Sequence, residues 1–208
     1  MPTVAGSWVL ATGNPGKLSE FRALLSSLPI EIVAAGDLGY TSPAETGETF
    51  AANALLKARE AARITGLPAI ADDSGLVVEA LDGAPGLFSA RYAGPDASDR
   101  DNVALLLKRL GSTGDPHRRA HFVACIVAVT PTDPDDPIIV EGRWHGTIAD
   151  TPRGEHGFGY DPIFVDADSG LTAAQLDPAE KNRRSHRAQA IRLLTARLSA
   201  SIRVRGNH

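Results

Sequence analysis

Residues 69–80 constrain the fold of this 208-residue chain more than any other stretch, because an acidic pair interrupts an apolar run. The sequence Ile-Ala-Asp-Asp-Ser-Gly at 70–75 places Asp72 and Asp73 between two apolar segments. Asp, Ser and Gly favour turns, so we expect two strands joined by a tight acidic turn. Paired acids at a strand end suit Mg²⁺, which takes oxygen ligands and keeps several waters. An ordinary acidic surface turn is the alternative, and the pair alone does not exclude it.

The composition is that of a soluble globular protein, with 43% hydrophobic and 22% charged residues. The only cysteine, Cys125, lies in an apolar run and has no partner for an internal disulfide, so we expect it to be buried. This cysteine usage fits a reducing, cytoplasmic location. No stretch reaches the length of about 20 apolar residues that a membrane helix needs, and no secretory signal pattern is visible. We therefore expect no membrane partner.

The net charge of -4 hides an asymmetry, because residues 181–208 carry eight of the 21 Lys and Arg residues and no acid. Such a basic end is typical of an anionic ligand site, of nucleic-acid binding or of a solvated helix face. The acidic remainder of the chain would repel a duplex, so nucleic-acid binding is the weaker alternative.

The first structural unit in the sequence is a strand, a Gly-containing turn and a helix start. Residues 7–11 are predicted to form the strand, Asn14 the N-cap and Pro15 the first helical residue. Free N–H groups at a helix start attract phosphate. Lys17 opposes the helix dipole there, which a nearby anion would explain; a purely structural turn is the alternative.

Alternating predicted strands and helices follow. We expect a second strand at 31–35, an alanine-rich helix at 49–65 and a helix capped by Ser98 and Asp101. Residues 122–129 are apolar on both faces and predict a central strand, with a hairpin partner at 138–148. No repeat or linker is visible, so we expect a single domain over residues 1–208, with two lobes around a groove.

Two further segments favour a ligand site near the C-terminus. Phe158-Gly159-Tyr160-Asp161-Pro162 combines aromatics, a carboxylate and glycines, as in a pocket for a flat ring; aromatics buried in the core are the alternative. Ser185 is predicted to cap the last helix, which places His186 and Arg187 in its first turn. That helix should bury one face, formed by Ala188, Ile191, Leu194, Leu198 and Ile202.

Together these motifs resemble the inosine/xanthosine triphosphate pyrophosphatases, which hydrolyse non-standard purine nucleoside triphosphates. The resemblance covers nearly the whole chain and includes Glu45-Thr46-Gly47, Gly83-Ala84-Pro85-Gly86 and Ser89-Ala90-Arg91-Tyr92 in the family's order. It implies a mixed α/β fold with a strongly twisted, elongated sheet whose flanking helices form two lobes around a nucleotide cleft. It also implies a homodimer, dependence on Mg²⁺, and conversion of ITP, dITP or XTP to the monophosphate and pyrophosphate.

The resemblance assigns site residues as follows. Glu45, Asp72 and Asp73 would hold Mg²⁺, with Asp73 also the general base. Phe158 would stack on the purine, and His186 and Arg187 would donate to its 6-oxo group. The complete set of expected substrate-binding residues is Thr12, Gly13, Asn14, Pro15, Gly16, Lys17, Ser74, Phe158, Gly159, Tyr160, Asp161, Lys181, His186 and Arg187. A magnesium-dependent phosphatase that releases orthophosphate is the nearer alternative, and the role of Arg91 and the residue that rejects guanine stay open.

Overall fold

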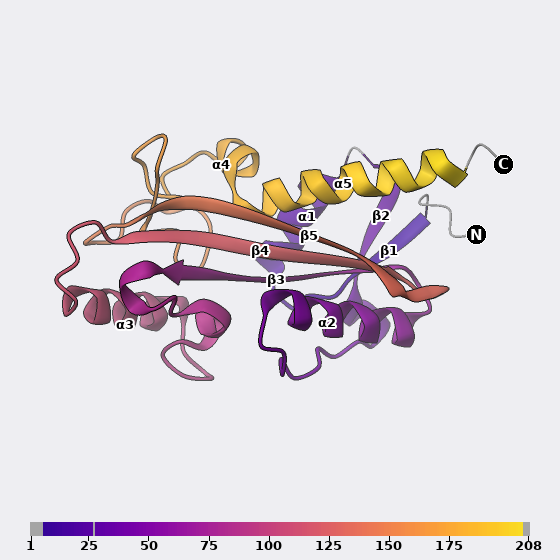
Figure 1. Ribbon diagram of the computed structural model, residues 1–208, viewed down its shortest axis with the longest axis horizontal. Helices are drawn as coiled ribbons and strands as arrows, with labels where there is room; N and C mark the ends of the chain where they lie inside the picture. Colours follow the sequence, from indigo (N-terminus) through magenta and orange to yellow (C-terminus); the bar gives the residue numbers. More distant parts are fainter. Residues whose placement is uncertain (1–5, 27, 206–208) are drawn as a thin grey trace. The chain divides into compact units, whose positions relative to one another are not determined.

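A computed structural model describes residues 6–26 and 28–205, with side chains described up to residue 199. Six strands form one mixed sheet in the order β2-β1-β3-β4-β5-β6 (Figure 1). The strands are β1 (Gly6–Leu10), β2 (Ile30–Ala34), β3 (Ala69–Val78), β4 (Arg119–Thr130), β5 (Asp133–Ile148) and β6 (Phe164–Asp166). The α-helices are α1 (Pro15–Leu25), α2 (Phe50–Thr65), α3 (Asp99–Gly111), α4 (Pro178–Arg184) and α5 (His186–Arg205).

The pairing of the strands follows from their connections. β1 is parallel to both β2 and β3, and helices α1 and α2 occupy the intervening segments of the chain. Strands β4 and β5 are separated by only two residues, a connection that suits an antiparallel hairpin. β6 pairs with β5 in the antiparallel sense. The mixed α/β class that was predicted is confirmed.

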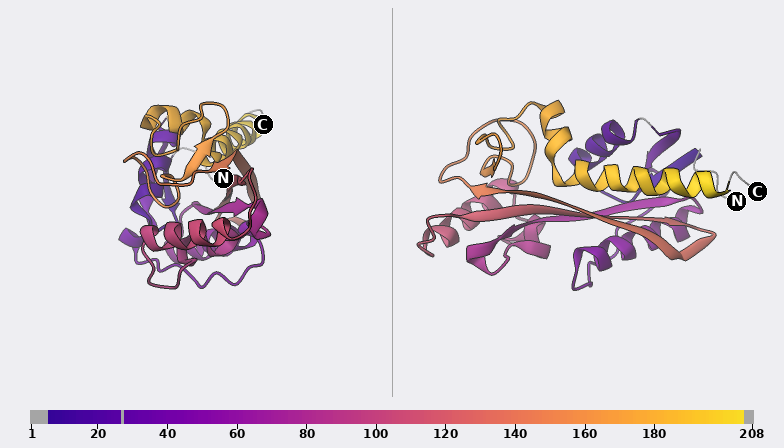
Figure 2. Two further views of the ribbon diagram at one scale, coloured as in Figure 1. Left: turned by 90° about the vertical axis from the view of Figure 1, so that its left-hand side faces the viewer. Right: turned by 45° about the horizontal axis from the view of Figure 1, so that its top comes forward.

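The chain divides into two compact units. The first unit comprises residues 1–73, 124–142 and 187–208. Strands β1, β3 and β4 of this unit contribute to cores on both faces, with α1 and α5 on one face and α2 on the other (Figures 1 and 2). One core contains Leu10, Phe21, Ile70 and Leu194, and the opposite core contains the alanines of α2 together with Val9 and Val127. Small alanine side chains let α2 approach the strands closely.

The second unit comprises residues 74–123 and 143–186. Its core is rich in aromatic residues, with Phe122, Trp144, Tyr160 and Phe164 packed with the apolar face of α3. The rings of Phe122 and Phe164 lie 4.6 Å apart between centroids. This aromatic core supports the loops between β5 and α4.

The acidic turn expected at residues 70–75 is wrong, because β3 runs without interruption from Ala69 to Val78. Both acids are buried within the strand, and each is paired with a cation from a helix. Asp72 lies beside Lys17, and Asp73 lies beside Lys57. Turn propensity was therefore overridden by tertiary contacts that the local sequence does not display.

Most of the helix predictions are confirmed. Asn14 caps α1 by accepting from the Lys17 amide, and Thr49 caps α2 by accepting from the Ala52 amide. Ser98 and Asp101 form the expected capping box of α3. Cys125 is buried and unpaired, as expected. Helix α4 was not expected, and Ile202 lies outside the described side chains.

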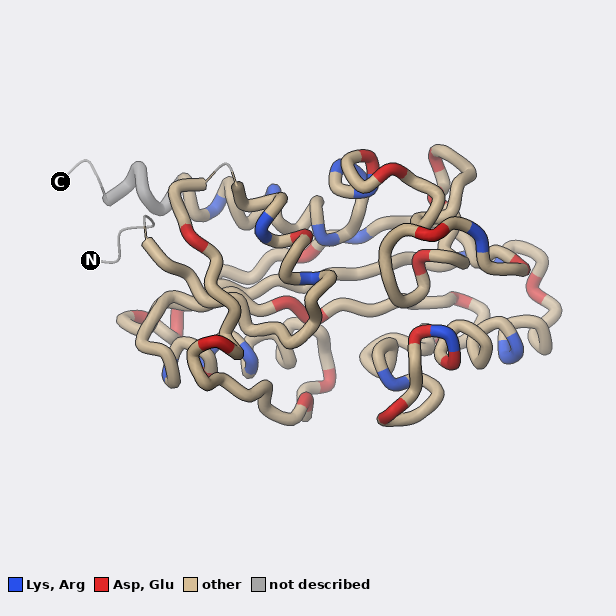
Figure 3. Tube along the Cα trace, turned by 180° about the vertical axis from the view of Figure 1, so that it is seen from behind, with Lys and Arg blue, Asp and Glu red and all other residues tan. Residues whose placement is uncertain are grey.

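A solvated helix face, one of the three alternatives for the basic end, does not account for every basic residue of α5. Basic positions recur along α5 (Figure 3), but Arg187 is buried and 2% exposed. Arg203 and Arg205 lie outside the described side chains. No helix in the described part of the chain has the length and apolar character needed to cross a bilayer.

Candidate active site

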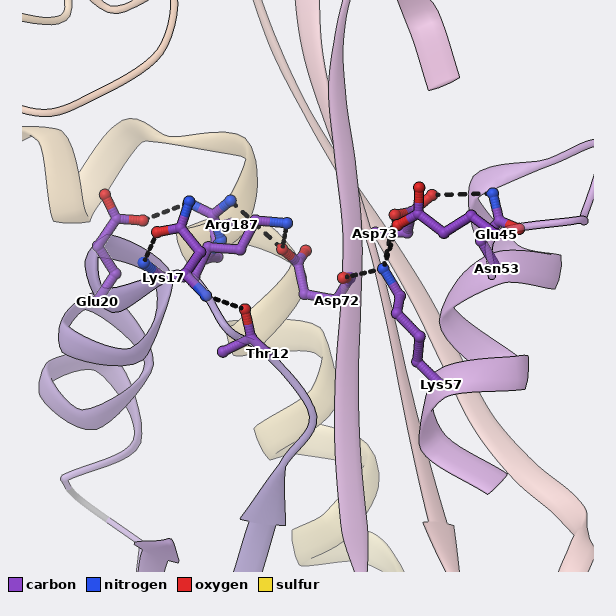
Figure 4. A network of polar contacts seen from close by, with 10 residues as sticks. Thr12, Lys17, Glu20, Glu45, Asn53, Lys57, Asp72, Asp73 and Arg187 are labelled. Carbon is purple, nitrogen blue, oxygen red and sulfur yellow. Dashed lines mark hydrogen bonds and ion pairs between the residues drawn. The ribbon is translucent and has the colours of Figure 1, made fainter. Parts of the chain in front are cut away.

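Because side chains alternate along a strand, Asp72 and Asp73 lie on opposite faces of β3. Side chains alternate along a strand, so Asp72 follows Ile70 and Asp73 follows Ala71. Ile70 belongs to the core beneath α1 and α5, and Ala71 belongs to the core beneath α2. Figure 4 shows the two carboxylates leaving the strand on opposite sides. The expected three-carboxylate cluster is therefore divided between two faces of one strand.

Asp72 faces cations from the starts of two helices. The Lys17 ammonium lies 2.7 Å from its Oδ2, and the Arg187 guanidinium lies 3.4 Å from the same oxygen. Arg187 also pairs with Glu20 of α1. The unfavourable position of Lys17 and Arg187 at helix starts is thus explained by a carboxylate of the protein itself.

Asp73 faces α2, where it shares Lys57 with Glu45. The Lys57 ammonium lies 2.7 Å from Asp73 Oδ1 and 3.1 Å from Glu45 Oε1, and it donates to the Asp72 carbonyl at 3.0 Å. Asn53, one turn earlier in α2, donates to Asp73 Oδ2 at 3.4 Å (Figure 4). Four polar groups from a strand, a helix and a loop therefore meet at one place.

Burial and neighbouring charges together set the pKa values of Asp73 and Lys57. Burial raises the pKa of Asp73 above its ordinary value, and the nearby Lys57 opposes that rise. Burial lowers the pKa of Lys57, but the carboxylates, Asp73 first, outweigh burial and leave the pKa raised. Lys57 therefore stays protonated at neutral pH, and Asp73 is a stronger base than a carboxylate in water.

The loop before α2 is built for close packing. Asn53 accepts a hydrogen bond from the Gly47 amide at 2.7 Å. A Cβ atom at Gly47 would lie 2.7 Å from Asn53 Oδ1, so only glycine fits without displacement. Asn53 thereby links the Glu45-Thr46-Gly47 segment to Asp73.

The donor set on the α2 face fits Mg²⁺ chemically. Glu45 and Asp73 direct carboxylates to one point, and Mg²⁺ is usually held by one or two carboxylates together with substrate phosphates and water. Among the described residues, no group of three or more Asp, Glu, His or Cys side chains converges as a metal site. Asp72, the third expected ligand, is placed beside Lys17 and Arg187 instead.

The turn before α1 satisfies two of its own amides. Asn14 N–H donates to Thr12 Oγ1 at 3.1 Å, and Lys17 N–H donates to Asn14 Oδ1 at 3.0 Å. Thr12 and Asn14 therefore hold the shape of the turn. The exposed Gly13 and Pro15 and the partly buried Gly16 complete it.

In the second unit, the aromatic loop divides into a buried and an accessible part. Tyr160 is 5% exposed, and its hydroxyl donates to the Ser89 carbonyl at 2.9 Å. Its side chain therefore belongs to the core, which is the alternative that the sequence left open. Phe158 is partly exposed, and the Lys181 ammonium lies 5.1 Å from its ring centroid. Phe158 thus has the accessible ring that stacking requires.

Asp161 and Lys181 form a buried pair. Asp161 Oδ2 accepts from Lys181 Nζ at 2.7 Å and from the Phe158 amide at 2.9 Å. A Cβ atom at Gly157 would lie 2.0 Å from the same oxygen, which explains a glycine there. Asp161 and Lys181 therefore hold the aromatic loop in place, independently of any contact with a substrate.

The remaining expected residues occupy different surroundings. His186 is 5% exposed and stacks on Phe122, with ring centroids 4.8 Å apart. Ser74 follows Asp73 on β3 and is partly buried. Arg187 belongs to the first unit, where it contacts Asp72 and Glu20. Donation by His186 and Arg187 to a purine stays a prediction.

Sequence reasoning missed Lys57, Asn53 and Glu20. Asn53 and Lys57 lie four residues apart on the buried, alanine-rich face of α2, and polar residues on an apolar face are the signal that could have revealed them. Glu20 lies three residues after Lys17 and so on the same side of α1.

A sequence model of the Ham1 family matches residues 8–197. The chain belongs to the Ham1 family. The relative from Xanthomonas oryzae pv. oryzae, named dITP/XTP pyrophosphatase, is 54% identical over 192 residues, which are 92% of this chain and 96% of the relative. A relative of the same name from Halorhodospira halophila is 52% identical over 93% of this chain and 98% of its own length.

Solved Ham1 structures share the fold. A HAM1 protein from Coxiella burnetii is 45% identical with a TM-score of 0.87, covering 93% of this chain and 98% of its own. A nucleoside-triphosphatase / dITP/XTP pyrophosphatase from Mycobacterium abscessus is 46% identical with a TM-score of 0.73, covering 90% and 98%. The family resemblance predicted from the motifs is therefore confirmed for this Ham1 chain.

Proposed function

We propose that this Ham1 chain hydrolyses non-standard purine nucleoside triphosphates such as dITP and XTP to the monophosphate and pyrophosphate. The observation that carries the proposal is the pair of oppositely directed acids on β3, each beside a cation from a helix. Relatives more than half identical over nine-tenths of the chain bear the name dITP/XTP pyrophosphatase. That name favours this reaction over a phosphatase that releases orthophosphate.

The residues on the two faces of β3 have different roles in hydrolysis: those on one face bind phosphate, and those on the other face activate water. Hydrolysis of the α–β phosphoanhydride places a highly charged triphosphate beside the protein, so cations must be available to it. Lys17 supplies one, and Asp72 keeps its ammonium oriented before the substrate arrives. Orientation before binding reduces the reorganisation that the reaction needs.

On the α2 face, Asp73 is the general base. Its raised pKa makes it a better acceptor for the proton that the attacking water loses. Lys57 holds the Asp73 carboxylate in place at 2.7 Å, and Asn53 contacts its second oxygen. Pyrophosphate leaves with the electron pair of the broken P–O bond.

Glu45 and Asp73 would hold Mg²⁺. The Lys57 ammonium, which pairs with both carboxylates, would also offset part of their negative charge. When bound, such an ion neutralises phosphate charge and lowers the pKa of its water. The homodimer is proposed from the family resemblance, and the cytoplasmic location from the cysteine usage. The mass of the assembly in solution tests the homodimer.

The experiment is a substrate panel with product analysis. ITP, dITP, XTP, GTP and ATP are each supplied with Mg²⁺, and both products are quantified. We expect IMP and pyrophosphate to appear in equal amounts from ITP, with ATP turned over far more slowly. IDP with orthophosphate would support the phosphatase alternative and contradict the proposal.

Binding to nucleic acid is a separate alternative. The three described arginines of α5 include one that is buried and paired with acids, which leaves fewer basic groups for a phosphate backbone. Duplex affinity with a steep salt dependence would revive that alternative.

A further inference from the structure

The base-recognition loop, residues 157–161, contacts three other segments of its unit. Tyr160 donates to the Ser89 carbonyl, and Asp161 pairs with Lys181 of α4. The third contact comes from α3, where Asp99 Oδ2 accepts a hydrogen bond from the Gly159 amide at 2.6 Å. Tyr160, Asp161 and Lys181 are buried, whereas Asp99 is exposed.

The contact from Asp99 acts on the backbone next to Phe158. The N–H of Gly159 lies in the peptide plane that carries the Phe158 carbonyl, so fixing it fixes the ψ angle of Phe158. The other side of Phe158 is fixed because its own amide donates to Asp161. Gly159 has φ +60, and glycine moves easily between backbone conformations. The direction of the Phe158 ring therefore depends on both amides being held.

We infer that Asp99 is a positioning residue for purine recognition, because it holds the Gly159 amide and thereby directs the Phe158 ring. The inference rests on the proposed function. Asp99 touches neither substrate nor reacting atoms in this role, and its effect is confined to the base end of a nucleotide.

A simpler role for Asp99 is favourable interaction with the dipole of α3, since it is the first residue of that helix. The two roles require different properties of the Asp99 side chain. A dipole role needs the negative charge, whereas the loop contact needs only an oxygen that accepts a hydrogen bond. Asp99→Asn keeps an acceptor and removes the charge, and Asp99→Ala removes both.

The test compares inhibition of ITP hydrolysis by the two products. IMP carries the base, and pyrophosphate does not. For Asp99→Ala we expect the inhibition constant of IMP to rise about five- to tenfold, as for one lost ordinary hydrogen bond, with that of pyrophosphate unchanged. Asp99→Asn should restore most of the IMP affinity. Hydrogen exchange of the peptide containing residues 157–161 should be faster in Asp99→Ala than in the wild type.

Asp101→Ala is the control, because it removes the capping box of α3 without touching the loop. An equal loss of IMP and pyrophosphate affinity in Asp99→Ala, no loss of either, or failure of Asp99→Asn to restore IMP affinity would each overturn the inference. An equal effect of Asp101→Ala on IMP would do the same. Failure of the wild-type protein to release pyrophosphate from ITP would instead contradict the proposed function.

Discussion

The buried charges around β3 are individually unfavourable and stable only as a group. Asp73 is 7% exposed, Lys57 6% and Asp72 2%. An isolated buried charge is strongly destabilising, whereas a hydrogen-bonded pair is tolerated. Each acid therefore depends on a cation that is distant in the sequence, and the site forms only when the unit folds.

Asp73→Asn tests the general base. Asparagine has nearly the same shape and keeps an oxygen toward Lys57, so the fold should persist. It cannot accept the proton of water, and we expect turnover of ITP to fall by about 10² or more. Steady-state kinetics with product analysis measures this. Asp135→Asn is the control, because that carboxylate is 90% exposed and pairs only with Arg59 among the described contacts. Near-normal turnover of folded Asp73→Asn would remove Asp73 from the role.

Lys57→Met tests whether the ammonium compensates the acids of the α2 face. The substitution leaves Asp73 and Glu45 without their shared cation, so we expect a loss of about 3 kcal/mol in the free energy of unfolding. Adding Asp73→Asn removes one of the two acids and should recover part of the loss. Urea unfolding of the wild type, both single variants and the double variant gives the coupling energy. Additive losses would mean that the pair does not act as a unit.

At the scale of elements, local chemistry predicted helix boundaries well. Asn14, Thr49 and Ser98 were expected as N-caps or first residues, and each accepts from a nearby amide in the structure. Capping is decided by residues within one turn, so it is visible in a single sequence. The mixed α/β fold class, in contrast, was implied by the family resemblance of the motifs.

The acidic stretch was misjudged because its stability is not local. Asp72 and Asp73 are separated in sequence from Lys17, Lys57 and Arg187, and only the folded sheet brings them together. Strand periodicity then assigns the acids to opposite faces. A single metal cluster was expected because both acids were placed in a turn. Once the segment is a strand, adjacent residues cannot point the same way.

Asp166→Asn tests how α4 is held to the end of β6. Asp166 accepts from Trp144 Nε1 at 2.8 Å, from Ser169 Oγ at 2.7 Å and from Arg184 at 3.2 Å. Burial opposes its ionisation, but the hydrogen bonds from Ser169 and Trp144 and the charge of Arg184 outweigh it and hold the pKa below the ordinary value. We expect Asn to lower the free energy of unfolding by about 2 kcal/mol at pH 7.

The pH dependence of that difference follows from the sign of the shift. A carboxyl whose pKa is lower in the folded state stabilises above its unfolded pKa of about 4, and the stabilisation is lost as the pH falls through the folded pKa. The wild type and Asp166→Asn should therefore converge in stability as the pH falls below about 4. Urea unfolding at pH 7, 5 and 3 measures this, with Asp168→Asn as an exposed neighbouring control. A constant difference across that range would contradict the role of the ionised carboxylate.

At the scale of the whole molecule, three strands contribute to both compact units. The division falls within β3 after Asp73, within β4 after Val123 and within β5 after Gly142. The two β3 acids therefore lie at the last two residues that β3 gives to the first unit. Each of these three strands is continuous across the division, so neither unit consists of complete strands alone.

We therefore expect the two units to unfold in one transition. The two tryptophans report on them separately, because Trp8 belongs to a core of the first unit and Trp144 to the core of the second. In Trp8→Phe and in Trp144→Phe, fluorescence of the remaining tryptophan is followed against urea, together with far-ultraviolet circular dichroism of the same sample. Coincidence of the two curves within each variant is the expected result, even if the loss of the Trp144 hydrogen bond to Asp166 shifts the midpoint. Fluorescence that changes at a different urea concentration from circular dichroism in either variant would mean that one unit unfolds while the other persists, and the shared strands would then not couple them.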